Sequence, residues 1–183
     1  TTDGEKDYVY GEPNTAWGFP HATELQVRWS PDSQRIFTVQ KDTRQVEALP
    51  LIQHVPQDGS IRPQVSFPKV AYPGDQHIET LRLLTVEIET GRHQSASYSQ
   101  VPVTRNSYCF FSSNFGWWHN NSKIAYFVDV DRYYKYVRVV EFDSESGKTT
   151  VLFEETSETQ ISLMSNGDMW PSFVPLPDTN ELL

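Results

Sequence analysis

The 183-residue chain has one cysteine, no G-x-S-x-G motif and no apolar run close to the ~20 residues of a membrane-spanning helix. The single cysteine, Cys109, cannot form a disulfide within the chain, and its apolar neighbours favour a buried, unreactive thiol. The missing G-x-S-x-G means that the nucleophile turn of an α/β-hydrolase is not encoded here. We therefore expect a chain without a membrane span that is catalytically inactive by itself.

Metal and cofactor motifs are also missing. The histidines follow no metal-ligand spacing, and H-E-x-x-H, C-x-x-C and EF-hand patterns do not occur. Serine–histidine pairs can be drawn from Ser60 or Ser97 with His77 or His93, but chance explains such pairs. Glycine-rich phosphate loops are absent as well. The sequence predicts no catalytic residue, metal or cofactor within this chain.

The net charge and composition of the chain limit the kinds of partner that it can bind. The chain carries 15 basic and 24 acidic residues, a net charge of −9, whereas nucleic-acid binding needs a cationic face. It is 37% hydrophobic and 13% aromatic, more than a disordered chain carries. We expect a folded, soluble protein with no nucleic-acid partner. The sequence identifies no compartment; residues 1–4 look like a cut inside a larger polypeptide, and a periplasmic or secreted parent would fit.

Two segments of the chain repeat one pattern. Residues 29–39 read WSPDSQRIFTV and residues 117–127 read WWHNNSKIAYF, which align without a gap at an offset of 117 − 29 = 88. Each contains an aromatic strand end, a polar turn, a basic residue and an apolar strand. After each comes a strand that closes on a glycine turn, VEIETG at 86–91 and VEFDSESG at 140–147. Such a meander is typical of a β-propeller blade.

The predicted fold is all-β: antiparallel blades of a partial β-propeller with a long inserted hairpin or arm. Helix is nearly absent, because no segment sustains a period of 3.6 residues. The first blade region covers 1–39 and 81–93. Between these parts lies an insertion, 40–80, rich in proline and carrying two strand-like runs, a composition that favours a functional excursion. The second blade region covers 107–157, and 158–183 begins the next blade.

Three smaller features have ordinary interpretations. Asp129 and Asp131 lie on one strand face and are expected to be solvated strand-end charges. Residues 120–122, Asn-Asn-Ser, read as a turn that uses asparagine in the left-handed region rather than as a glycosylation site. A group of aromatic residues is expected to be mainly inter-blade core rather than a stacking platform. Its members are Trp117, Trp118, Tyr133, Tyr134 and Tyr136.

Several segments occur in an order that resembles a known family. They are DYVYGE at 7–12, WSPDS at 29–33, DT at 42–43 followed by LPLI at 49–52, PKVAYPGD at 68–75 and EETS at 154–157. WSPDS alone is common to many propellers, whereas the ordered set is more specific. It closely resembles the N-terminal β-propeller domain of dipeptidyl peptidase IV-like serine peptidases of the prolyl oligopeptidase (S9) family. The resemblance covers essentially the whole chain but only part of that domain.

The resemblance implies a binding residue. In that family an eight-bladed funnel lies over an α/β-hydrolase domain that carries a Ser-Asp-His triad, and a short propeller segment presents two glutamates to the substrate's free N-terminus. In this chain Glu12 matches one glutamate, and Pro13 occupies the position of the other. A buried ammonium needs charge-assisted acceptors, so one acid should hold it more weakly. Glu5 is a neighbouring acid that could substitute.

The implied function is that of a non-catalytic propeller segment of a dipeptidyl peptidase IV-like serine peptidase, which gates substrate access and helps to recognise the peptide N-terminus through Glu12. Its partners would be a peptide substrate and a C-terminal α/β-hydrolase domain beyond residue 183, with the insertion reaching toward that domain or a partner subunit. The alternatives are a stand-alone β-propeller-like binding or scaffold protein and a glycan-binding β-domain that uses the aromatic residues. Because a partial propeller exposes apolar faces, we also expect a homo-oligomer.

Overall fold

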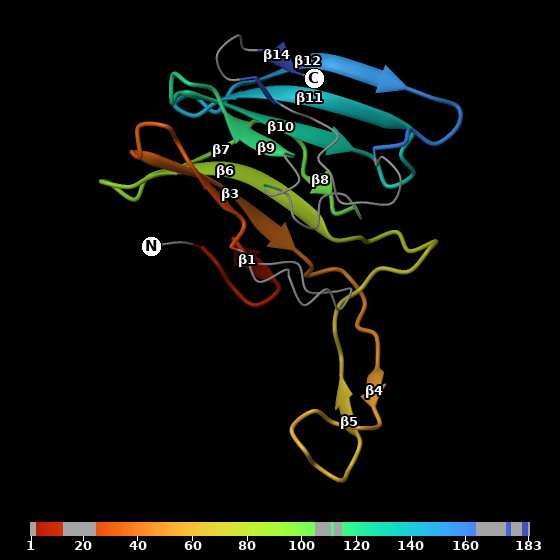
Figure 1. Cartoon of the computed structure of the whole chain (residues 1–183). Helices are drawn as coiled ribbons and strands as arrows, with labels where there is room; N and C mark the ends of the chain where they lie inside the picture. The colour runs from red at the N-terminus through yellow and green to blue at the C-terminus, as the bar shows by residue number, and fades with distance from the viewer. Residues whose placement is uncertain are drawn as a thin grey trace.

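The structure is a computed structural model that describes residues 3–12, 25–104, 111, 115–163, 175–176 and 181–182. Every regular element among these residues is a β-strand, and every strand pair is antiparallel, as the sequence predicts. Figure 1 shows two main sheets that lie one against the other, with a hairpin projecting away from both. The all-β prediction with a long inserted hairpin is confirmed.

Each main sheet follows the blade pattern with strands in a meander. The first sheet contains β1 (Tyr8–Tyr10), β2 (Val27–Trp29), β3 (Arg35–Asp42), β6 (Thr80–Glu87), β7 (His93–Ser95) and β8 (Val101–Pro102). The second contains β9 (Gly116–Trp118), β10 (Ile124–Val130), β11 (Tyr136–Asp143) and β12 (Thr149–Thr156). β13 (Pro175–Leu176) and β14 (Glu181–Leu182) form a separate pair.

The projecting hairpin lies inside the first sheet's sequence. β4 (Leu51–Gln53) pairs with β5 (Gln64–Ser66), and the connection that contains them joins the end of β3 to the start of β6. β3 and β6 themselves pair along their whole length, from Arg35 opposite Glu87 to Asp42 opposite Thr80. The insertion therefore leaves the sheet without breaking its central strand pair (Figure 1).

The structure corrects the alignment of the two repeats by one residue. Ser33 and Ser122 occupy the same turn position, each in the left-handed region with φ of 59°. Trp29 and Trp118 are each the last paired residue of the strand before that turn. The structural offset is therefore 122 − 33 = 89 rather than 88. The sequence alignment matched the wrong member of a Trp-Trp pair, whereas the turn geometry identifies the equivalent one.

The core lies between the two sheets. Phe37 of β3 has no exposed surface, and its ring packs edge-on against Phe111 and Trp118 at centroid distances of 5.1 and 6.1 Å. Phe142 of β11 lies 6.0 Å from the same ring. Polar contacts add to this packing, because the indole N–H of Trp118 donates to the Arg28 carbonyl at 3.0 Å. The two sheets thus share one aromatic core.

Two of the smaller expectations are wrong. Asp129 is only 3% exposed, so it is a buried acid rather than a solvated strand end. In the Asn-Asn-Ser turn the left-handed residue is Ser122, and Asn121 instead accepts a backbone hydrogen bond from Lys123 at 3.0 Å. Cys109 lies outside the described residues, as does much of the start of the second blade region, because 105–110 and 112–114 are not described.

The aromatic residues that the sequence grouped together differ in their exposure to solvent. Trp117 and Trp118 are buried, as expected of core residues, and Trp117 stacks on Tyr126 at 5.6 Å. Tyr133, in contrast, is 67% exposed at the turn between β10 and β11. These side chains therefore form no single exposed platform.

Candidate functional site

Glu12 lies where the edge strand of the first sheet is interrupted. β1 and β2 pair one after the other with the same strand, β3. Between them the Gly11 N–H donates to the Val39 carbonyl at 2.9 Å, and the Gly11 carbonyl accepts from the Gln26 N–H at 3.0 Å. Gly11 has φ of 59°, in the left-handed region that favours glycine. Glu12 directly follows Gly11 and is the last residue of the described segment 3–12.

Glu12 is paired with a lysine of the neighbouring strand. The Lys41 ammonium lies 2.7 Å from Glu12 Oε2. The lysine side chain is mostly buried, with 13% exposed, whereas the Glu12 side chain is 49% exposed. A buried ammonium requires an anionic partner, and Glu12 supplies it from the solvent side. The sequence-predicted site residue therefore already binds a primary ammonium within the protein.

Glu79 is a second acid beside this pair. It directly precedes β6, and Lys41 lies opposite Leu81 in the β3–β6 register, so strand alternation places Glu79 on the same face as Lys41. Glu79 is 7% exposed, and its carboxylate has no hydrogen bond or ion pair within the described part of the chain. Burial raises the pKa of Glu79, the charge of Lys41 lowers it, and the charge of Glu12 raises it further. The three groups therefore interact electrostatically.

Glu5, which the sequence suggested as a substitute acid, is held elsewhere. Its carboxylate lies 3.1 Å from Arg44 Nη1, and Arg44 Nη2 lies 2.7 Å from Asp42. The hydrogen bond from Arg44 holds the pKa of Asp42 below its usual range. Because Asp42 and Lys41 are successive residues of β3, they point to opposite faces of the sheet. Glu5 thus belongs to the other face, and Pro13 lies outside the described residues.

The second sheet contains a different buried acid, Asp129. The Tyr98 hydroxyl donates to its Oδ2 at 2.9 Å, and Arg138 Nη1 lies 3.9 Å from the same oxygen. Oδ1 is buried without a hydrogen-bond partner. Burial raises the pKa of Asp129 against the opposing effects of Tyr98 and Arg138, and burial also raises the pKa of Tyr136 to about 12. This group links the connector before β9 to the second sheet.

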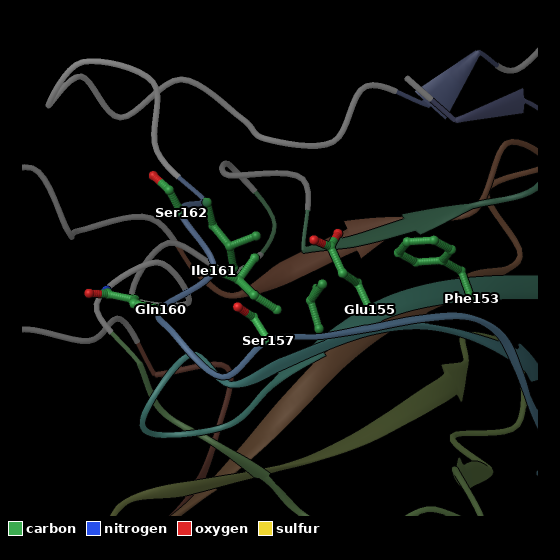
Figure 2. Close-up of a pocket in the computed structure, with 8 residues that line it drawn as sticks. Phe153, Glu155, Ser157, Gln160, Ile161 and Ser162 are labelled. Carbon is green, nitrogen blue, oxygen red and sulfur yellow. The ribbon is translucent and has the colours of Figure 1, made fainter.

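The described part of the chain also contains two surface hollows away from Glu12. One, of about 540 Å³, lies at the base of the hairpin and is lined mainly by apolar side chains together with Arg132 and Tyr133. The other, of about 400 Å³, lies beside the end of β12. Its lining includes Phe153 and Glu155 of β12 and Gln160 and Ile161 of the segment that follows, which Figure 2 labels.

The serine–histidine pairs that the sequence suggested are not hydrogen-bonded in the described ranges. Ser60 bonds to Gln64 and Arg62, and His77 and His93 make no hydrogen bond to either candidate serine. Among the described residues, no three His, Cys, Asp or Glu side chains lie close enough together to hold a metal ion. Within the same residues, no helix has the length and apolar character needed to cross a membrane.

The fold is similar to solved peptidase structures. One is a protein of Bacteroides ovatus ATCC 8483 assigned as a dipeptidyl aminopeptidase IV, with a TM-score of 0.63 and 16% sequence identity. Another is dipeptidyl peptidase 4 of Porphyromonas gingivalis, with a TM-score of 0.64 and 14% identity. Each match covers 87% of this chain and 21% of the solved chain, so the chain spans about a fifth of their length.

A sequence comparison with curated proteins finds no match. The family model described as "Dipeptidyl peptidase IV (DPP IV) N-terminal region" matches residues 1–181, nearly the whole chain. The match is consistent with the antiparallel blade pattern and with the fold of the solved relatives. The chain therefore belongs to the dipeptidyl peptidase IV N-terminal region family, as a partial propeller of that domain.

Proposed function

We propose that this non-catalytic propeller segment gates substrate access in a dipeptidyl peptidase IV-like serine peptidase and that Glu12 helps to bind the free N-terminus of the peptide. The observation that carries the proposal is the Glu12–Lys41 pair. Lys41 offers Glu12 a primary ammonium at 2.7 Å, which is the same chemical group as a peptide N-terminus. Glu12 also keeps about half of its side chain exposed, so a second ammonium can approach it.

The test uses the full-length protein and a chromogenic Xaa-Pro dipeptidyl substrate, with and without N-terminal acetylation. We expect hydrolysis to need the free amine and to fall at least about tenfold in Glu12→Gln, because a charge-assisted hydrogen bond is lost. Hydrolysis that is indifferent to both changes would remove Glu12 from the site. No hydrolysis of either substrate would favour a binding or scaffold protein without peptidase activity.

The proposed function also implies a C-terminal hydrolase domain and a division of this chain into blades. A C-terminal α/β-hydrolase domain would supply the Ser-Asp-His triad, and the peptide would reach it past the two blades. We propose that these blades correspond to residues 1–39 with 81–93 and to residues 107–157, that 40–80 is an insertion and that 158–183 opens the next blade. A G-x-S-x-G motif followed by Asp and His in the sequence downstream of residue 183 would support the peptidase, and a stop codon there would contradict it.

We also propose that the protein forms a homo-oligomer. Large apolar side chains of the hairpin region are exposed to solvent, a condition that favours association. They are Leu51, Ile52, Val55, Ile61, Val65 and Phe67. Light scattering coupled to size-exclusion chromatography should show more than one copy per particle, and a monomer across the accessible concentration range would contradict this.

A further inference from the structure

The hollow beside the end of β12 has two walls that the fold holds in place. One wall is β12, and the other is the segment 157–163 that follows it (Figure 2). The Ser157 N–H donates to the Lys135 carbonyl at 2.9 Å, which ties the start of this segment to the turn between β10 and β11. The Ile161 N–H donates to the Tyr134 carbonyl of the same turn at 2.8 Å. With a volume of about 400 Å³, the hollow falls within the size range of natural ligand sites.

The hollow combines buried apolar side chains with an aromatic ring and an acid. Val137, Ile161 and Leu163 line it with exposed fractions of only 2, 9 and 7%. Glu155 lies opposite Val137 in the β11–β12 register, and Phe153 is two residues earlier on the same face of β12. Phe153 is 48% exposed, so its ring remains accessible to a ligand.

Glu155 is the one charged residue that lines the hollow. Within the described part of the chain its carboxylate makes no hydrogen bond or ion pair, and neither does the side-chain amide of Gln160. The adjacent Glu154 differs, because it lies on the opposite face of β12 and pairs with Arg138. The hollow therefore presents one unpaired negative charge and an amide oxygen beside apolar surface. A ligand that complements it has one positive charge at the end of an apolar stem.

We propose that this hollow binds the arginine side chain of a peptide segment. The guanidinium would pair with Glu155 through two N–H groups, stack on the Phe153 ring and donate to the Gln160 amide oxygen. Its aliphatic stem would contact the apolar side chains that line the hollow. Arginine suits the site better than lysine, because its planar group can pair with a carboxylate and lie against a ring at the same time. The site lies in the second sheet and does not depend on the function proposed for Glu12.

The test is calorimetric titration of the full-length protein with the peptide acetyl-Gly-Arg-Gly-amide and with its citrulline counterpart, which has the same shape but no charge. Both ends of each peptide are blocked, so neither offers a free N-terminus to Glu12. We expect the arginine peptide to bind saturably and the citrulline peptide to bind at least about tenfold more weakly, as when a charge-assisted hydrogen bond is lost. Equal affinities, or no binding of the arginine peptide, would overturn the proposal.

Substitution of the acid locates the binding. Glu155→Gln keeps the shape of the side chain and removes its charge, and Glu155 is exposed, so the fold should tolerate the change. We expect this variant to bind the arginine peptide about tenfold more weakly and to lose the preference over citrulline. Glu154→Gln is the matched control, since Glu154 is the next residue of the strand but faces the other side. Equal losses in the two variants would place the peptide elsewhere and overturn the proposal.

The ring and the shape of the cation give a second readout. Phe153→Leu keeps an apolar side chain but removes the ring, and it should weaken binding of the arginine peptide by about two- to fivefold. The corresponding lysine peptide should bind the wild-type protein more weakly than the arginine peptide, because an ammonium cannot pair and stack in the same way. A lysine peptide that binds as tightly as the arginine peptide would overturn the assignment of arginine.

Discussion

The two sheets have the same order of strands, but the connection between their two central strands differs in length. In the second sheet β10 turns into β11 through residues 131–135, and the Asp131 carboxylate accepts backbone hydrogen bonds within that turn. In the first sheet the equivalent connection, between β3 and β6, extends over residues 43–79 and contains the β4–β5 hairpin. Lys41 and Glu79 lie at the two ends of that long connection. The Glu12–Lys41 ion pair therefore lies where the first sheet has a long insertion in place of the second sheet's tight turn.

The shared plan extends to buried polar residues. At the structural offset of 89, Gln40 of β3 corresponds to Asp129 of β10, and both are fully or almost fully buried. Gln40 lies opposite Arg82 in its sheet, and Asp129 lies opposite Arg138. Each sheet therefore places a buried polar side chain opposite an arginine, but only the second sheet makes it an acid. The repeat therefore keeps a buried polar side chain at this position but does not keep its charge.

The largest expected effect comes from breaking the core that both sheets share. Phe37→Ala removes a ring with no exposed surface that contacts aromatic side chains of β9 and β11. We expect a loss of about 3–5 kcal/mol in the free energy of unfolding, measured by urea denaturation with tryptophan fluorescence. Tyr126, which corresponds to Phe37 at the offset of 89, is half-buried, so Tyr126→Ala should cost less. Equal costs would contradict the view that the core centres on Phe37.

A second comparison uses the two equivalent glycine turns. Gly91 and Gly147 both have φ in the left-handed region, 69° and 79°. Alanine at either position should cost about 1–2 kcal/mol of backbone strain. At Gly147 a Cβ atom would also lie 2.7 Å from the Ser95 carbonyl of the first sheet, whereas at Gly91 nothing lies within 4 Å. Gly147→Ala should therefore lower the melting temperature more than Gly91→Ala, and the reverse order would show that the sheets do not meet there.

The sequence was sufficient to predict the fold because its signals are local. Period-two alternation, the turn residues of 30–34 and the glycine turns near 91 and 147 identified the strands and the inserted hairpin. The offset between repeats was wrong by one because Trp117 and Trp118 are adjacent and equally good matches for Trp29. Only the positions of the left-handed turn residues separate them.

The candidate site was predicted only in part. Glu12 was found through the resemblance, but Lys41 and Glu79 were missed, because their contacts depend on the register of β3 with β6 across a long insertion. A signal for Lys41 exists in the alternation of Phe37, Val39 and Lys41, which places a lysine on the buried face of β3. Asp129 was missed for a similar reason, since its partner Tyr98 comes from a connector without periodicity.

The second sheet has a buried acid, Asp129, where the first has the neutral Gln40, so we expect the stability contributed by the second sheet to depend on pH. Burial raises the pKa of Asp129 in the folded protein. The folded protein therefore binds the Asp129 proton more tightly than the unfolded chain does, which stabilises the fold. This contribution is fully present below the carboxyl pKa of the unfolded chain and is lost as pH rises through the raised pKa of the folded protein. Asp129→Asn makes this position neutral, as Gln40 is in the first sheet, and should remove that loss. Urea denaturation at a series of pH values should show the variant gaining stability relative to wild type as pH rises, and a constant difference would contradict the assignment.

The smallest expected effect concerns how the second sheet orients the hairpin of the first. Arg132, in the turn between β10 and β11, donates from Nη1 to the Asp75 carbonyl at 2.7 Å and from Nη2 to the Tyr72 carbonyl. Both acceptors lie in the segment that returns from the hairpin to β6, so these bonds fix the base of the hairpin to the neighbouring sheet. The hairpin contributes little to the core because β4 and β5 are exposed along their whole length.

Arg132→Ala should therefore change the free energy of unfolding by only about 0.5–1.5 kcal/mol while loosening the hairpin. Hydrogen exchange in the full-length protein should accelerate over residues 49–53 and 64–69 and stay unchanged in β3 and β6, because the β3–β6 pairing does not depend on the insertion. Lys135→Ala is the matched control, since Lys135 lies in the same turn but donates to the Glu158 carbonyl, away from the hairpin. Faster exchange in both variants would indicate that the turn as a whole, rather than Arg132, holds the hairpin. The comparison of the sheets would then change, because the tight turn would support the hairpin through its shape and not through one side chain.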